Sequence, residues 1–208
     1  QALEDQYHGF EDRRIIDDFV NYATVLFKKL GDRVKYWIIM NEQNVFTTFG
    51  WMNGMHPPGK KNEEKLFYQV NHHANIAFAK SVLALKALYP DAKVGSSFAY
   101  TPGYAYDRHP ENAMALEDYN DLKNFYWMDI YALGRYPRAA IKYLESKGVA
   151  PEFAPGDKQV LKEAAAKVDF MGVNYYQSCV VEHNPIDGVG MSMEMNTTGK
   201  KGTAKVSG

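Results

Sequence analysis

An alternation of long amphipathic segments with short apolar runs constrains the fold of this chain most. Apolar residues recur at helical spacing over residues 12–30 and 63–89. Short runs with the composition of buried strands occupy residues 34–42, 93–99 and 168–176. Helices that alternate with strands apolar on both faces are typical of a parallel sheet covered by helices. We therefore expect an α/β fold.

Further helices are expected between the last two strands. Their signals are a helical pattern over residues 118–133 that stops at Gly134, a short helix opened by Pro137 and ended by Gly148, and a helix from Asp157, as its N-cap, to Lys167. Residues 43–59 and 100–110 read as loops, because Gly, Pro and aromatic residues interrupt any periodicity.

The C-terminal region differs in composition from the rest. Residues 184–208 are dominated by Gly, Lys, Thr, Ser and Asn, so we expect a long loop or flexible tail of the same domain, which itself covers residues 1–183. Met191, Met193 and Met195 alternate, and this spacing would also fit one half of a strand pair.

Charge and cysteine content narrow the function classes. Lys and Arg total 24 and Asp and Glu total 25, a balance that supports neither a nucleic-acid nor a membrane-surface partner. No apolar stretch approaches the roughly 20 residues of a membrane span. The single cysteine, Cys179, fits a reducing compartment such as the cytoplasm. The chain begins at Gln1 without an initiator Met or a signal segment, so we expect a partial chain.

Four polar residues stand where two predicted strands end. Asn41 and Glu42 end the first strand, and Asn174 and Tyr176 share one face at the end of the third. Active sites of parallel α/β folds lie at these carboxyl ends, so the four side chains can converge. A Glu there can act as general acid and base if its surroundings raise its pKa. From the residues alone, a solvated or helix-capping Glu is the commoner alternative.

Other candidate site residues are weaker. His72 and His73 are neighbours on a helix, point about 100° apart and have no His four residues away, which favours packing or capping over a metal site. His56 and His109 read as loop residues. Trp51, in a loop, could stack on a sugar or pack in the core. No Gly-rich phosphate loop supports nucleotide binding.

Six segments together resemble glycoside hydrolase family 1, the β-glucosidase and 6-phospho-β-glucosidase group. In order, they are GDRVK at 31–35, YWIIMNE at 36–42, GMHPPG at 54–59, a His pair at 72–73, DIYALGRYP at 129–137 and DFMGVNYY at 169–176. Most of the family follows Asn-Glu with Pro. Here Gln43 and Asn44 follow, a variant similar to the bacterial 6-phospho-β-glucosidase branch.

The resemblance implies a (β/α)8 TIM barrel and retaining hydrolysis of β-glycosides without a metal or cofactor. By position, Glu42 would be the general acid/base and Asn41 would bind the sugar 2-hydroxyl. Asn174 and Tyr176 would line the sugar subsite, with Tyr176 near the nucleophile. Retention requires a second carboxylate about 5–5.5 Å from the first.

That second carboxylate has no counterpart in this chain. The family's nucleophile is a Glu in a Thr-Glu-Asn-Gly-like strand. Glu194 is the nearest imitation, and we reject it because it lies in the expected tail. Residues 1–5 are similar to the segment after the family's third strand, and residues 205–208 to the segment shortly before its seventh. The chain would then be an internal fragment with roughly strands four to six and their helices, inactive alone and able to self-associate through its exposed edges.

The expected function is therefore that of a parent enzyme. It would hydrolyse β-glucosides, specifically 6-phospho-β-glucosides, although the phosphate-binding residues of that branch would lie beyond residue 208. A plain β-glucosidase remains an alternative within the class. A non-catalytic fragment is the alternative from another class, because the nucleophile strand is absent.

Overall fold

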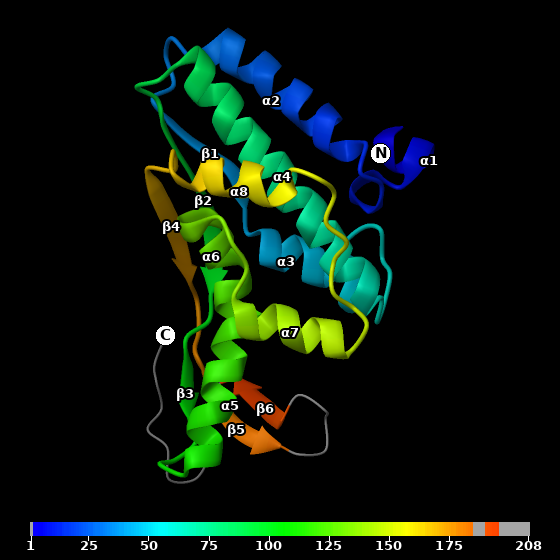
Figure 1. The fold of residues 1–208 in the computed structure, drawn as a ribbon, viewed down its shortest axis with the longest axis vertical. Coiled ribbons are helices and arrows are strands. Elements are labelled where there is room, and N and C mark those ends of the chain that lie inside the picture. Colours follow the sequence, from blue (N-terminus) through cyan, green and yellow to red (C-terminus); the bar gives the residue numbers. More distant parts are fainter. Residues whose placement is uncertain (1, 185–189, 196–208) are drawn as a thin grey trace.

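Three parallel strands form the central sheet of the molecule. The computed structural model describes residues 2–184 and 190–195, and orders the sheet as β1 (Tyr36–Asn41), β2 (Lys93–Tyr100) and β4 (Phe170–Tyr175) (Figure 1). Both pairings are parallel. β1 and β4 fall within the predicted ranges, β2 extends one residue beyond its range to Tyr100, and the α/β prediction is confirmed.

The described residues contain eight α-helices. They are α1 (Ala2–Tyr7), α2 (Ile15–Leu30), α3 (Gln43–Thr47), α4 (Glu64–Leu88), α5 (Pro110–Asn120), α6 (Tyr126–Leu133), α7 (Arg138–Ser146) and α8 (Asp157–Ala165). Shorter turns are a 3₁₀ turn at Gly9–Glu11 and π-helical turns at Thr48–Met52 and Asp121–Phe125. In the described part of the chain, no helix is both long and apolar enough to cross a membrane.

One face of the sheet carries the helices. α4 contacts β1 and β2, α6 contacts β2, and α2 and α8 both pack on α4 (Figure 1). Trp37 points to this face, because its ring meets Phe27 of α2 at 4.9 Å between centroids. Tyr36 and Ile38 alternate with Trp37, and their side chains are 71% and 54% exposed. The expected burial on both faces is therefore wrong for the described residues, because the helices cover only one.

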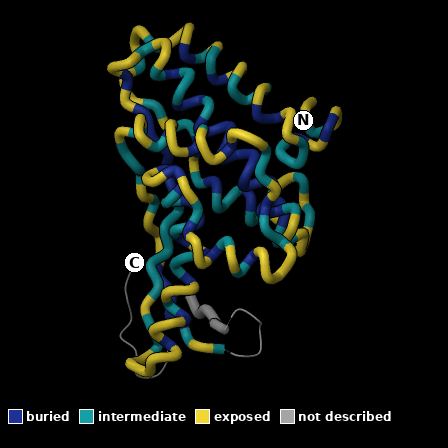
Figure 2. Tube along the Cα trace, viewed as in Figure 1, coloured by how far each residue is buried: buried dark blue, intermediate teal, exposed yellow. Residues whose placement is uncertain are grey.

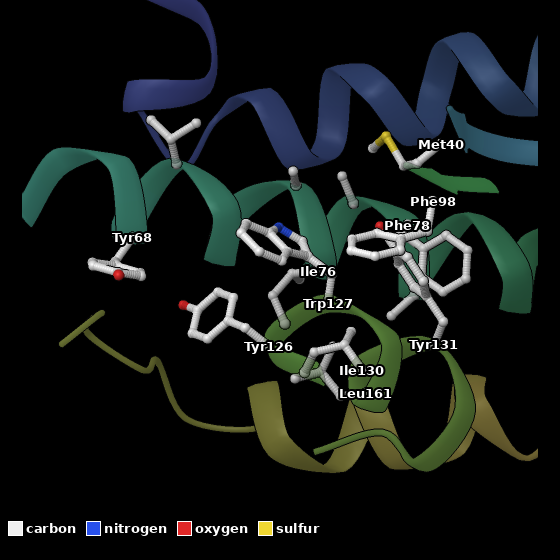
Figure 3. Close-up of a cluster of buried hydrophobic side chains, with 14 of the residues drawn as sticks. Met40, Tyr68, Ile76, Phe78, Phe98, Tyr126, Trp127, Ile130, Tyr131 and Leu161 are labelled. Atoms are coloured by element: carbon white, nitrogen blue, oxygen red, sulfur yellow. The ribbon is translucent and has the colours of Figure 1, made fainter. Parts of the chain in front are cut away.

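The core lies between α4, α6 and the sheet. Figure 3 shows aromatic side chains packed there. The rings of Phe78 and Tyr131 are tilted and those of Tyr126 and Trp127 meet edge to face, with centroids 4.7 and 5.2 Å apart. Burying such rings contributes roughly 2–3 kcal/mol each. Figure 2 shows buried positions gathered where α4 meets the sheet. The long helix predicted at 63–89 is thus confirmed as the central helix of the fold.

Several boundaries differ from the predictions. Residues 43–52 are helical rather than looped, because the side chains of Gln43 and Thr47 are buried against α4. The helix expected at 118–133 starts earlier, at Pro110, and a π-helical turn divides it. It ends as expected at Gly134, whose φ of 66° suits glycine. Asp157 is the first residue of α8, and Gly156 takes the N-cap position.

A second, smaller sheet corrects two further predictions. β3 (Gly103–Ala105) pairs parallel with β5 (Cys179–Asn184), so residues 100–110 are not entirely a loop. β5 pairs antiparallel with β6 (Gly190–Met195), so a loop or tail is wrong for these six residues. Half of a strand pair was the alternative for the alternating Met residues, and the pairing agrees with it. Residues 185–189 and 196–208 lie outside the described residues, and the division at 183/184 stays a prediction.

The pairing of β1 with β2 contains one irregularity. Ile38 pairs with Gly95, whereas Asn41 pairs with Ser97, so three steps along β1 match two along β2. β1 therefore carries one extra residue just before its carboxyl end, as in a β-bulge.

Candidate active site

Glu42 lies directly between β1 and α3 in an uncommon backbone conformation. Its φ and ψ are 48° and 51°, in the left-handed region, which costs a non-glycine residue about 1–2 kcal/mol. Its N–H donates to the Ser97 carbonyl at 2.9 Å, and its own carbonyl accepts from Val45 N–H at 2.9 Å. Although Glu42 occupies the N-cap position of α3, its carboxylate makes no capping hydrogen bond. The carboxylate is thus left for other partners.

Those partners come from the end of β4. Asn174 Nδ2 donates to Glu42 Oε1 at 2.7 Å, and Tyr176 OH donates to the same oxygen at 3.4 Å. The two residues lie 132 and 134 positions further along the chain. The carboxyl ends of the parallel strands therefore bring Glu42, Asn174 and Tyr176 together.

Asn41 lies on the open face of the sheet beside this cluster. It shares a register position with Ser97, which in turn pairs with Gly172. Its Oδ1 accepts a hydrogen bond from Ser97 Oγ. Ser97 was not singled out from the sequence, although a serine pair at 96–97 within an otherwise apolar strand was a usable signal.

His72 and His73, the next candidates, form hydrogen bonds to other parts of the fold. The His72 ring is fully buried between Tyr136 OH, at 2.9 Å, and Asp157 Oδ2, at 2.8 Å. His73 Nδ1 lies 2.9 Å from the Phe10 carbonyl. Both contacts agree with the packing interpretation.

Trp51 also belongs to the interior. It is 4% exposed, and its indole N–H donates to Glu11 Oε1 at 2.8 Å. The alternative of a sugar-stacking Trp51 is therefore wrong.

The described residues form part of a parallel α/β fold, with the Glu42 carboxylate at the carboxyl end of one strand. The model of the family described as "Glycosyl hydrolase family 1" matches residues 1–207, so the chain belongs to glycosyl hydrolase family 1.

Two curated relatives are similar to this chain over most or all of its length. The aryl-phospho-beta-D-glucosidase BglC of Bacillus subtilis is 47% identical over the whole chain, and the match covers 43% of that protein. Beta-glucosidase A of Acetivibrio thermocellus is 30% identical over 92% of the chain and is covered to 42%.

Solved structures agree on the fold. The rice Os3BGlu6 beta-glucosidase superposes with a TM-score of 0.83 at 26% identity, over 93% of this chain and 45% of that one. The family 1 β-glucosidase of Thermotoga maritima gives 0.80 at 28% identity, over 93% and 42%. The chain therefore folds as part of a (β/α)8 barrel and spans less than half the length of these relatives.

Proposed function

We propose that this chain supplies the general acid/base, Glu42, to a retaining glycosidase that acts on 6-phospho-β-glucosides. One observation carries the proposal. The Glu42 carboxylate stands at the carboxyl end of a barrel strand, leaves its own helix uncapped, and accepts hydrogen bonds from Asn174 and Tyr176.

The hydrogen bonds to Glu42 support different tasks for its two carboxylate oxygens. Both side-chain donors address Oε1, so Oε1 is the acceptor. Oε2 would then carry the proton that Glu42 gives to the departing glycosidic oxygen. In the second half of the reaction, the ionised carboxylate would take a proton from the water that releases the sugar. Asn41 would bind the 2-hydroxyl, and Asn174 and Tyr176 would line the sugar subsite.

The nucleophile would come from outside these residues. Retention needs a second carboxylate about 5–5.5 Å from Glu42. The relatives are more than twice as long as this chain, which supports a longer polypeptide that contributes that group. The same remainder of the barrel would cover the exposed Tyr36 and Ile38 side chains.

Two features favour a phosphorylated substrate. The most similar of the relatives described above is an aryl-phospho-beta-D-glucosidase, and Gln43-Asn44 follows the Asn-Glu pair in place of Pro. We place the enzyme in the cytoplasm, since the single Cys179 fits a reducing compartment. The β-glucosidase relatives keep a plain β-glucosidase as the alternative.

A pair of substrates tests the sugar. For the full-length polypeptide that contains these residues, we expect kcat/KM for 4-nitrophenyl β-glucoside 6-phosphate to exceed that for 4-nitrophenyl β-glucoside about 10²-fold or more. A site built to bind a charged group discriminates strongly against an analogue that lacks it. A preference for the unphosphorylated glucoside would establish the plain β-glucosidase instead.

A second test concerns the 208 residues by themselves. The sheet edges at β1 and β4 and the exposed sheet face predict self-association rather than a monomer of 23.6 kDa. Size-exclusion chromatography of the isolated chain should give larger species without glycosidase activity. A stable, compact and active monomer would contradict both the missing nucleophile and the exposed edges.

A further inference from the structure

Gln43 follows Glu42 directly and is completely buried. Its Nε2 donates to the Asn71 carbonyl at 3.1 Å and to Asn75 Oδ1 at 2.9 Å, both on α4. Its Oε1 accepts from Tyr131 OH of α6 at 3.0 Å. Two of the helices that pack on the sheet thus bind one amide.

The chemistry of the partners fixes the orientation of these amides. A backbone carbonyl can only accept, so the atom of Gln43 that faces the Asn71 carbonyl must be the NH₂ group. The indole of Trp127 can only donate, and it lies 2.7 Å from Asn71 Oδ1. Asn71 Nδ2 donates in turn to the Phe67 carbonyl at 2.9 Å. Neither amide can flip without losing a hydrogen bond.

The hydrogen bonds continue from Gln43 to a buried charge. Asn75 Nδ2 donates to Tyr136 OH at 2.9 Å, and Tyr136 OH lies 2.9 Å from His72 Nδ1. His72 Nε2 lies 2.8 Å from Asp157, which also binds the guanidinium of Arg13. Because an ionised Asp157 only accepts, His72 carries a proton on Nε2, and burial lowers the pKa of its ring, which favours the neutral form. From Gln43 to Asp157, each donor in this series of hydrogen bonds then points toward Asp157, and such bonds polarise and strengthen one another.

Asn44, the residue after Gln43, fixes the same segment to strand β2. Asn44 Nδ2 donates to the Ala99 carbonyl at 2.9 Å, and Ala99 N–H donates to Asn44 Oδ1 at 3.3 Å. Together with the Glu42–Ser97 backbone bond, this fixes the segment to β2. A left-handed, non-glycine residue persists only where its surroundings over-determine its conformation.

We infer that Gln43 is a positioning residue whose buried amide holds the left-handed backbone of Glu42, and so aims the carboxylate at Asn174 and Tyr176. The inference rests on the proposed acid/base role of Glu42. Without the amide, residue 42 can relax toward an ordinary conformation, and a displacement of about 1 Å costs roughly 10²-fold in rate.

Gln43→Leu removes the hydrogen bonds at similar volume. In the full-length polypeptide we expect kcat/KM for phenyl β-glucoside 6-phosphate to fall about 10²-fold, and to fall much less for the 2,4-dinitrophenyl glycoside, whose departure needs no acid. The ratio of the two kcat/KM values therefore reports on the aim of the carboxylate, which a loss of stability alone would not change.

Asn124→Leu is the matched control. Asn124 is a buried amide that donates to the Thr101 carbonyl at 3.1 Å, outside the Gln43 network. Asn124→Leu should lower the melting temperature comparably, without changing the ratio of kcat/KM between the two leaving groups. If Gln43→Leu behaves like this control, the positioning role is wrong.

Tyr131→Phe covers the case in which Gln43→Leu does not fold. It removes one hydroxyl from Gln43 Oε1 and should produce about a tenfold change in the same leaving-group ratio. An unchanged ratio in this folded variant overturns the inference. Glu42→Gln separates the two proposals: if it leaves the leaving-group dependence unaltered, the acid/base role itself fails, whereas a normal response there with none at Gln43 removes only the positioning role.

Discussion

Replacing Glu42 by glutamine in the full-length polypeptide is expected to lower kcat/KM for phenyl β-glucoside 6-phosphate about 10²–10⁴-fold. Glutamine keeps the length of the side chain and an oxygen that can accept from Asn174 at the present 2.7 Å. It cannot give up a proton to the departing oxygen. With 2,4-dinitrophenyl as leaving group the first step should be nearly unaffected, because this phenolate departs without protonation.

The second step of the same variant should also slow. Without a general base, the covalent glycosyl-enzyme is hydrolysed slowly and accumulates, so dinitrophenolate release should begin with a burst. Stopped-flow absorbance measures the burst, and azide, which needs no deprotonation, should restore turnover.

A carboxylate elsewhere provides the control for Glu42. Glu64 is bound by Lys147 Nζ at 2.9 Å on the surface, and Glu64→Gln should leave all of these kinetic constants unchanged. If Glu42→Gln hydrolyses the phenyl glycoside at the normal rate, Glu42 is not the acid/base.

The largest effect on stability is expected at Asp157. Its buried carboxylate accepts from Arg13, from His72 Nε2 and from the Ala154 N–H at 2.8 Å. Asp157→Ala leaves these donors without an acceptor, and we expect the free energy of unfolding to drop by about 3 kcal/mol. Urea unfolding of the full-length polypeptide, followed by far-UV circular dichroism, measures the change.

The pH dependence of stability should follow from the same group of residues. Burial lowers the pKa of His72 below 6.5, against the opposing effect of Asp157. Burial alone would raise the pKa of Asp157, but hydrogen bonds from Arg13 and His72 lower it below 3.8. Both groups bind protons more weakly when folded, so their contribution is complete above pH 6.5. It is lost as the pH falls through 6.5 and then through 3.8.

Asp17 is the surface control for Asp157. Its carboxylate is 77% exposed and meets Lys80 Nζ at 3.0 Å. Asp17→Ala should change the free energy of unfolding by less than about 1 kcal/mol. Equal losses from the two substitutions would mean that the buried Asp157 contributes no more than an exposed ion pair.

The sequence predicted those parts of the fold that depend on local periodicity. Helix α4 and the three central strands carry a clear apolar spacing, and the carboxyl ends of parallel strands must meet, so Glu42 and Asn174 could be placed together in advance. Helix α3 could not be predicted. It is helical because Gln43 and Thr47 find buried partners on α4, and a polar side chain looks the same in a sequence whether it meets water or another amide.

The register between neighbouring strands could not be predicted from the sequence either. That Ser97 stands beside Asn41 depends on the pairing offset between β1 and β2, which no single strand contains. For the same reason, the sequence favours a tail at residues 190–195 and offers strand β6 only as an alternative. Its alternation became meaningful only once β5 provided an antiparallel partner.

The extra residue in β1 lets two consecutive side chains point to opposite faces of the sheet in the order that the core and the site require. In an unbroken strand, every second residue would share the side of Ile38, so Met40 would face the open interior and Asn41 would be turned into the helices. The offset before Asn41 reverses which face the last two side chains of the strand point to. Met40 is 4% exposed and stays in the core, while Asn41 is delivered to the face where a sugar would lie.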